Sequence, residues 1–481
     1  MSIFRRESAG AALVVSICLL LRCGGSMADA RPNIVFMMTD DQGPWALGAA
    51  GDPNALTPNL DRLRSESAML ANCYTPTPVC SPARASVLTS RYGTELGMTD
   101  YLSPANVNAD GLPPSVPTWP RALSSAGYTT GLVGKYHCGQ KAEAHPTEIG
   151  YDEFKGFIHG GMTSRDPDVE IDRKTRRVEG WTPDILTDYA IDFVRRRQDS
   201  PFALSLHFWA PHANQGTNEA GDRTWLPLSA ADWKPFQDLD PELPEPVFPQ
   251  LDIARTHRML REYLASIHSV DRNIGRLLDV LDDLGLADNT IVIFTSDHGY
   301  NLGHHGIWHK GNGRWLLLDN QGPRANMWDH SLRVPAIVRW PGRIRPNSTV
   351  NRTVSHLDWF PTILAVAGVE LPLRTVIRGR SILPLLKGET PDWNDEFFAQ
   401  YRMRADNAEG ADMRSYQTRA WKLVRFLRSR RSHEFYDRLH DPEERTNLIE
   451  SADPVVRKAR KQLESKLMAA MRAISDPAAK D

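Results

Sequence analysis

The chain contains 481 residues, of which 41% are hydrophobic and 24% are charged. Lysine and arginine together number 57, aspartate and glutamate 59, and the formal net charge is -2. This composition argues against a disordered chain, and the balanced charge argues against nucleic acid or a membrane surface as the partner. The length is sufficient for one large domain with an appendage, or for two domains.

The first thirty residues have the layout of an export signal. Two arginines precede an apolar run over residues 11–21, and the small-residue cleavage site Ala28-Asp29-Ala30 follows. A membrane anchor is the alternative, but the run is shorter than the ~20 residues that span a bilayer. We therefore expect residues 1–30 to be a signal peptide, the mature protein to be periplasmic or secreted, and the chain to have no stable membrane span.

Short apolar runs alternate with helical stretches along the next part of the chain. The apolar runs predict buried strands at residues 33–38, 129–133, 202–208, 291–295 and 336–339. The amphipathic stretches predict helices at residues 59–70, 116–126, 185–197, 256–284 and 357–367. This alternation is typical of an α/β fold in which a large, mostly parallel sheet is sandwiched by helices.

Two regions depart from the alternation. Residues 209–249 are rich in Pro, Asp and Trp without a clear period, which predicts a long loop region that walls a substrate pocket. The catalytic part is expected to cover residues 31–369. Residues 370–481 are predicted to form a smaller C-terminal α+β subdomain, with strands at 421–426 and 433–436 in a small antiparallel sheet and a terminal helix at 455–474.

The most distinctive motif is Cys80-Ser81-Pro82-Ala83-Arg84. Alone, such a string also fits a turn in which proline opens a helix. Other polar clusters follow predicted strands, and in parallel sheets ligands bind beyond the carboxyl ends of the strands. These clusters are Asp40-Asp41, Gly134-Lys135-Tyr136-His137, Ala210-Pro211-His212 and Thr295-Ser296-Asp297-His298-Gly299.

This ordered set of motifs resembles the type I sulfatase family, whose members share an alkaline-phosphatase-like α/β fold. The resemblance covers residues 33–368. In that family a separate formylglycine-generating enzyme oxidises the motif cysteine to formylglycine (3-oxoalanine), and the resemblance implies the same for Cys80. It also implies a sulfuric ester hydrolase, with a sulfated small molecule or glycan, most often a carbohydrate, as the substrate.

The resemblance further implies a calcium ion. Asp40, Asp41 and Asp297 offer the hard oxygen ligands that calcium prefers, and the modified Cys80 would complete the site. His298 stands where the family has Asn or His, although an imidazole is an unusual ligand for a hard cation. Without the motif set, adjacent aspartates after a strand are more often only part of a turn.

Roles for the remaining residues follow from the resemblance and from their charge. Arg84 is expected to bridge the nucleophile and the metal carboxylates, and Lys135 and Lys310 to neutralise sulfate oxygens. His212 is the expected acid for the leaving group, and His137 the expected base. Two features depart from the family: His212-Ala213-Asn214 lacks the usual proline, and residues 314–324 look like an insertion after Lys310.

Several alternatives stay open from the sequence. The same site chemistry fits a phosphodiester or phosphonate hydrolase of this fold, and an unmodified Cys80 would fit a non-catalytic protein that binds sulfated glycans. The histidines at 298, 304, 305 and 309 could instead form a transition-metal site. If Cys80 is modified, Cys73 and Cys138 either pair or remain buried thiols.

Overall fold

The structure is a computed structural model that describes residues 31–103, 111–214, 216–244, 246–403, 411–427 and 433–480. The predicted export signal at residues 1–30 lies outside the described residues. Residues 31–481 form one compact unit. Within the described ranges, none of the helices combines the length and the apolar character that crossing a bilayer requires.

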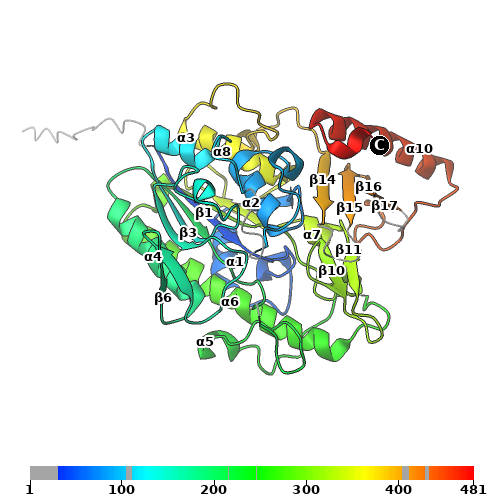
Figure 1. Ribbon diagram of the computed structural model, residues 1–481, viewed down its shortest axis with the longest axis horizontal. Coiled ribbons are helices and arrows are strands. Elements are labelled where there is room, and N and C mark those ends of the chain that lie inside the picture. The colour runs from blue at the N-terminus through cyan, green and yellow to red at the C-terminus, as the bar shows by residue number, and fades with distance from the viewer. Residues whose placement is uncertain are drawn as a thin grey trace, which may run out of the picture. The chain divides into compact units, whose positions relative to one another are not determined.

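A ten-stranded sheet forms the centre of this unit (Figure 1). Two departures from parallel pairing occur: β12 runs antiparallel to both of its neighbours, and β5 and β6 add an antiparallel edge. The predicted large, mostly parallel sheet is therefore confirmed. In spatial order the strands are β13 (Ser348–Ser355), β2 (Ala68–Tyr74), β12 (Ala336–Arg339), β8 (Thr290–Ser296), β1 (Asn33–Thr39), β7 (Phe202–His207), β3 (Thr129–Lys135), β4 (Glu153–Phe157), β5 (Asp168–Ile171) and β6 (Lys174–Arg177).

Helices cover both faces of the sheet, as alternate side chains of β1 show. Phe36 points into a core shared with α2 (Cys80–Thr89), α3 (Trp119–Ser125) and α8 (Trp359–Ala367). Its neighbour Met37 points into a second core. Because successive residues of a strand face opposite sides, these cores lie on opposite faces of the sheet. The second core is built with α1 (Pro58–Ser65), α4 (Thr182–Arg197) and α6 (Ile253–Asp283).

Some elements differ from the sequence-based expectation. The predicted helix at 59–70 ends at Ser65, because Ala68–Tyr74 forms β2 in the interior of the sheet. The edge strand β13 was not predicted, since its residues are largely polar and only Val354 and Ser355 of its eight residues are buried. The predicted loop region at 209–249 contains only the short helix α5 (Ala230–Trp233) in its described part.

The C-terminal part holds a four-stranded antiparallel sheet made of β14 (Phe397–Arg402), β15 (Asp412–Gln417), β16 (Trp421–Phe426) and β17 (Glu434–Asp437). One face packs on the terminal helix α10 (Pro454–Ala473), and the other shares a core with Tyr74 and Val79. The sheet thus packs against the residue that directly precedes α2. Two further short helices are α7 (Asp329–Leu332) and α9 (Leu383–Leu386).

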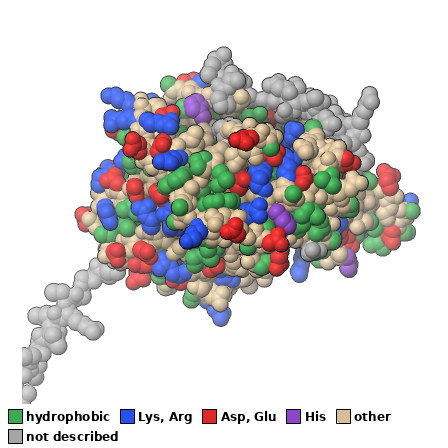
Figure 2. Space-filling model, turned by 90° about the horizontal axis from the view of Figure 1, so that it is seen from below, with side chains coloured by type: hydrophobic (Ala, Val, Ile, Leu, Met, Phe, Trp, Pro, Cys, Tyr) green, Lys and Arg blue, Asp and Glu red, His purple; other side chains and the backbone are tan. Residues whose placement is uncertain are grey.

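A third, three-stranded sheet consists of β9 (Ile307–Trp308), β10 (Asn312–Trp315) and β11 (Pro323–Ala325). The segment at 314–324 that looked like an insertion is the antiparallel turn from β10 to β11. On the face of the molecule shown in Figure 2, basic and acidic side chains of the described residues lie interspersed with apolar ones.

Candidate active site

Cys80 lies at the floor of a cavity of about 870 Å³. It is the first residue of α2, and its side chain is buried. The cavity is also lined by four other predicted site residues, Asp41, His137, His212 and Lys310. The remaining five, Asp40, Arg84, Lys135, Asp297 and His298, are buried beside them.

The sheet topology explains why these residues meet. Asp40 and Asp41 directly follow β1, and Asp297 directly follows β8, its parallel neighbour. Lys135 ends β3, which together with β7 continues the same parallel array. Because parallel strands end at one edge of a sheet, these side chains converge there, as the sequence predicted.

The three carboxylates converge on one nitrogen atom. His298 Nε2 lies 3.2 Å from Asp297 Oδ1, 3.4 Å from Asp41 Oδ1 and 3.9 Å from Asp40 Oδ1. Cys80 Sγ lies 3.5 Å from both Asp40 Oδ1 and His298 Nε2. Ligand atoms of Asp40, Cys80, Asp297 and His298 lie within 4.8 Å of one another, and Asp41 forms a second such group with Asp40 and His212. The carboxylates are hard oxygen donors of the kind that calcium prefers.

The tautomer of His298 leaves its second nitrogen open to this cluster. Its Nδ1 lies 3.0 Å from the carbonyl oxygen of Gly299, which can only accept a hydrogen bond, so Nδ1 carries the proton. Burial lowers the pKa of His298, which favours the neutral ring. The Nε2 lone pair therefore faces the three carboxylates and can act as a ligand.

Three cations surround the carboxylates. Lys310 Nζ lies 2.6 Å from Asp41 Oδ1 and 3.0 Å from Cys80 Sγ. Arg84 Nε donates to Asp297 Oδ2 at 2.9 Å, and Lys135 Nζ donates to Asp40 Oδ2. Three positive and three negative charges thus balance in the protein alone.

These contacts set the charge states of the cluster. Burial alone would raise the pKa of Asp40, but Lys135, His212 and Arg84 hold it well below its usual value. In contrast, burial and, to a smaller extent, the negative charge of Asp40 raise the pKa of the unmodified Cys80 thiol to about 12. The unmodified side chain is therefore a neutral thiol at neutral pH, and a thiolate nucleophile is not favoured.

Two further histidines line the cavity with defined tautomers. His137 Nε2 donates to the carbonyl oxygen of Leu102 at 2.9 Å, and its buried Nδ1 has no hydrogen-bond partner in the described part of the chain. His212 Nδ1 donates to the carbonyl oxygen of Ala213 at 2.7 Å, which directs Nε2 toward Asp41 Oδ2, 3.7 Å away. One nitrogen of each ring is thus free for proton transfer.

The long loop after β7 forms part of the cavity wall, as expected. Residues between Ala213 and Arg223 line the cavity, together with Arg255 from α6 and Arg314 from β10. No sequence motif pointed to these arginines. Tyr263 of α6 was also not predicted, although its hydroxyl donates to the backbone carbonyl of Asp41 at 2.7 Å and so fixes that turn.

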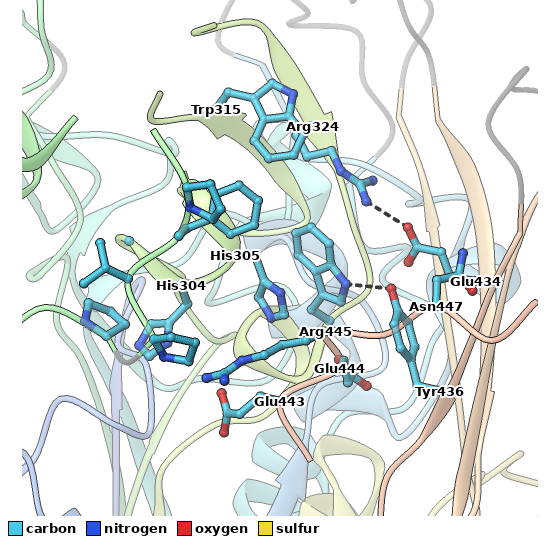
Figure 3. Close-up of a pocket in the computed structure, with 17 residues that line it drawn as sticks. His304, His305, Trp315, Arg324, Glu434, Tyr436, Glu443, Glu444, Arg445 and Asn447 are labelled. Carbon is cyan, nitrogen blue, oxygen red and sulfur yellow. Dashed lines mark hydrogen bonds and ion pairs between the residues drawn. The ribbon is translucent and has the colours of Figure 1, made fainter. Parts of the chain in front are cut away.

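The four histidines considered as a transition-metal site do not form one ligand group among the described residues. His298 faces the carboxylates, and His309 Nδ1 lies 2.8 Å from Asn312 Oδ1. His304 and His305 instead line a separate pocket of about 650 Å³ (Figure 3). There His305 stacks on Trp328 at a centroid distance of 4.1 Å, and His304 groups with His330 and Glu443.

The other two cysteines of the described chain, Cys73 and Cys138, are buried free thiols. Cys73 belongs to the core between the sheet and α2, α3 and α8. Cys138 Sγ lies 3.8 Å from the carbonyl oxygen of Ser81. Of the two alternatives left by the sequence, a disulfide or two buried thiols, the structure therefore has the two buried thiols.

Comparison with known proteins gives consistent matches. The sulfatase family model matches residues 32–369, and that of the N-sulphoglucosamine sulphohydrolase C-terminal region matches residues 322–473. An N-acetylglucosamine-6-O-sulfatase of Bacteroides thetaiotaomicron is 30% identical, over 88% of this chain and 83% of the relative. A steryl-sulfatase of Rattus norvegicus is also 30% identical, over 77% of this chain and 73% of the relative.

Among solved structures, a similar one is a complex with the substrate D-glucosamine-2-N,6-O-disulfate. It has a TM-score of 0.78 and 28% identity, and the match covers 93% of this chain and 98% of that chain. The sulfatase match spans most of the chain, and relatives at 30% identity cover more than two thirds of it. The chain therefore belongs to the sulfatase family and is a sulfatase-family enzyme.

Proposed function

We propose that this enzyme removes sulfate from a sulfated carbohydrate, using a formylglycine made from Cys80 and a bound calcium ion. The observation that carries the proposal is the position of Cys80. Its Sγ lies 3.5 Å from Asp40 Oδ1 and 3.0 Å from Lys310 Nζ, at the floor of a cavity. This is where an oxygen nucleophile would meet a cation on one side and a sulfate ester on the other.

Asp40, Asp41, Asp297 and His298 would hold the ion, together with the modified side chain at position 80. When bound, calcium and the hydrated formylglycine supply an activated oxygen nucleophile and electrostatic attraction for the sulfate. Since the protein charges already balance, a divalent cation leaves the site with an excess of about two positive charges. That excess favours an anionic ester.

The cations have separate positions and therefore separate proposed roles. Lys310 lines the cavity and reaches Cys80 Sγ, so its ammonium would neutralise sulfate oxygens directly. Lys135 and Arg84 lie behind the carboxylates, where Lys135 donates to Asp40 and Arg84 donates to Asp297. From there they would contribute positive potential to the transition state rather than a direct contact.

The histidines would move protons. His212 would donate from Nε2 to the departing alcohol, and burial, which lowers its pKa, makes its protonated form a stronger acid. His137 would accept a proton at Nδ1, which has no partner among the described residues, while the aldehyde is regenerated. Asp297 would accept the proton of the nucleophile, because its carboxylate lies in the same cluster.

A carbohydrate substrate is supported by the relatives and by the cavity. One relative is named for an N-acetylglucosamine sulfate and one solved structure for a glucosamine disulfate. The cavity lining carries asparagine, threonine, glutamine and arginine side chains, which hydrogen-bond hydroxyl groups. We also propose that residues 1–30 are a cleaved export signal, and that residues 31–369 and 370–481 are the catalytic part and the C-terminal subdomain.

The test combines mass spectrometry with turnover. The proposal predicts formylglycine at position 80 in protein from the native host, and faster hydrolysis of an aryl sulfate than of the matching aryl phosphate. Faster hydrolysis of the phosphate would favour a phosphodiester or phosphonate hydrolase. An unmodified thiol in all molecules, without turnover, would leave a protein that only binds sulfated glycans.

A further inference from the structure

Three arginines line the active-site cavity outside the catalytic cluster. Arg223 comes from the loop after β7, Arg255 from the first turn of α6, and Arg314 from β10. Among the described residues that line the cavity outside the cluster, Asp222 is the one carboxylate. This wall, which we call the arginine wall, therefore carries an excess of positive charge.

Asp222 pairs with two arginines of α6, one of which belongs to the arginine wall. Its Oδ1 lies 2.8 Å from an Arg255 nitrogen, and its Oδ2 accepts from Arg258 at 3.1 Å. Arg258 also pairs with Glu262 at 2.9 Å. Asp222 and Glu262 thus pair with Arg255 and Arg258, and neither carboxylate balances Arg314.

Two donor nitrogens of Arg255 have no acceptor among the residues that the structure describes. Only 13% of its side chain is exposed, yet Nε and Nη1 are buried without a hydrogen-bond partner in the described residues. A buried charged donor without an acceptor is costly, and structures rarely retain one without a reason. An anionic ligand group in the cavity would supply the missing acceptors.

We infer that the arginine wall binds a second anionic group, a sulfate or carboxylate, of the same substrate molecule whose ester is cleaved at Cys80. This inference rests on the proposed sulfatase function and narrows it. The substrate is then a glycan that carries at least two negative groups, rather than the single sulfate ester of a neutral alcohol.

The position of Arg314 fits this role. It is exposed on β10, within the β9–β11 sheet that contains the insertion. Its neighbour Trp315 lines the other pocket, shown in Figure 3. Because successive residues of a strand face opposite sides, β10 separates the two cavities and presents Arg314 to the active-site side.

Calorimetric titration of the full-length enzyme tests the inference without relying on turnover. The two probes are a highly sulfated heparin-type tetrasaccharide and a chitin-type tetrasaccharide with one sulfate. We expect the wild type to bind the first at least ~10-fold more tightly, and Arg255→Ala to reduce that ratio by ~10-fold, since a charge-assisted hydrogen bond is lost. Arg314→Ala should reduce it by ~3-fold, because its exposed charge is screened.

Arg276→Ala is the matched control, since it removes an arginine of α6 that pairs with Asp188 away from the cavity lining. It should leave the ratio unchanged. A wild-type ratio near one, or an Arg255→Ala ratio equal to that of the wild type, overturns the inference. If Arg255→Ala does not fold, an unchanged ratio in Arg314→Ala overturns it instead. Absence of aryl sulfate turnover would count against the proposed function alone. The inference about the arginine wall is tested separately, because the binding ratio does not depend on turnover.

Discussion

Two buried charge clusters in this enzyme invite comparison. In the first, Asp40, Asp41 and Asp297 meet Arg84, Lys135 and Lys310 beside Cys80. The second joins α7 to the C-terminal sheet: Asp329 accepts from Lys422 at 2.7 Å, from Arg438 at 2.8 Å and from the Tyr74 hydroxyl at 3.1 Å. Both are buried, and both hold the pKa of an aspartate well below its usual value.

The two clusters differ in whether their carboxylate oxygens are left open to a ligand. Both oxygens of Asp329 are occupied by donors from the protein, so this aspartate has no oxygen left for a ligand. In the first, three carboxylates direct oxygens at one histidine lone pair, and the cluster opens on a cavity. Charge balance alone therefore does not identify a functional site. Convergence of like charges next to a cavity does, because only a ligand can complete it.

The largest expected effect comes from removing the nucleophile. Cys80→Ala should lower kcat/KM for an aryl sulfate by at least ~10³-fold, because no other side chain replaces it. The free energy of unfolding should change by less than about 1 kcal/mol, since alanine also fits the start of α2. Steady-state kinetics and urea unfolding check this, and a variant with near-normal rates would refute the assigned nucleophile.

Removing the calcium ion should have the second largest effect. Dialysis against a calcium chelator should reduce turnover to background and destabilise the enzyme by about 3 kcal/mol relative to calcium at 100 times its Kd. Asp297→Asn should need more calcium to reach half of its own maximal activity, because it removes one of three converging charges, and that maximum should be lower because an amide cannot accept the proton of the nucleophile. Calcium titrations followed by activity and by Tm measure both, and activity that survives exhaustive chelation contradicts the metal assignment.

Breaking the closed cluster should affect stability instead. Asp329→Asn removes the carboxylate that Lys422 and Arg438 share and leaves Lys422 paired with Glu444 alone. This should cost about 3 kcal/mol of unfolding free energy. The kcat of the folded fraction should stay near that of the wild type, because Asp329 does not line the active-site cavity. If kcat falls with stability unchanged, the two clusters are not functionally distinct.

The smallest effect concerns acid sensitivity beside the closed cluster. Burial, with His304 and Lys422 nearby, lowers the pKa of His305 to about 3. Between the ordinary value of 6.5 and about 3, the unfolded chain binds a proton that the folded protein does not. Above pH 6.5 the protonation of His305 therefore has no effect on stability. Below pH 6.5 the free energy of unfolding falls by about 1.4 kcal/mol per pH unit, down to about pH 3.

His305→Gln should accordingly make the stability less dependent on pH between 6 and 4, roughly by the equivalent of one proton. The exposed His440, changed to Gln, is the matched control. Urea unfolding at several pH values measures both slopes. Equal slopes for the wild type and His305→Gln would contradict the assigned protonation state.

How much the sequence predicted depends on the kind of signal each element carries. The interior parallel strands were found because burial on both faces makes them continuous apolar runs, as in β1 and β8. The edge strand β13 has polar alternate residues, and β2 continues directly after a helical stretch, so neither gave such a run. The number of strands was therefore underestimated although the fold class was right.

The same distinction holds within the site. Asp40 and Asp297 lie in compact motifs at strand ends, where local sequence already suggests a ligand edge, and Cys80 lies in a compact motif that begins α2. Arg255 and Tyr263 belong to α6, whose sequence reports only an amphipathic helix. Which of its polar residues face the cavity is set by packing against the sheet, and this tertiary information is not contained in the pattern.

A crystal structure of active enzyme grown with calcium, with the ion identified by anomalous scattering, tests the central claim most directly. The account predicts a calcium ion bound by Asp40, Asp41 and Asp297, in contact with an oxygen on the former Cys80 side chain. A structure without an ion, in which the carboxylates pair solely with Lys135, Lys310 and Arg84, would contradict the account. The cluster would then have all its oxygens satisfied by the protein, as Asp329 has.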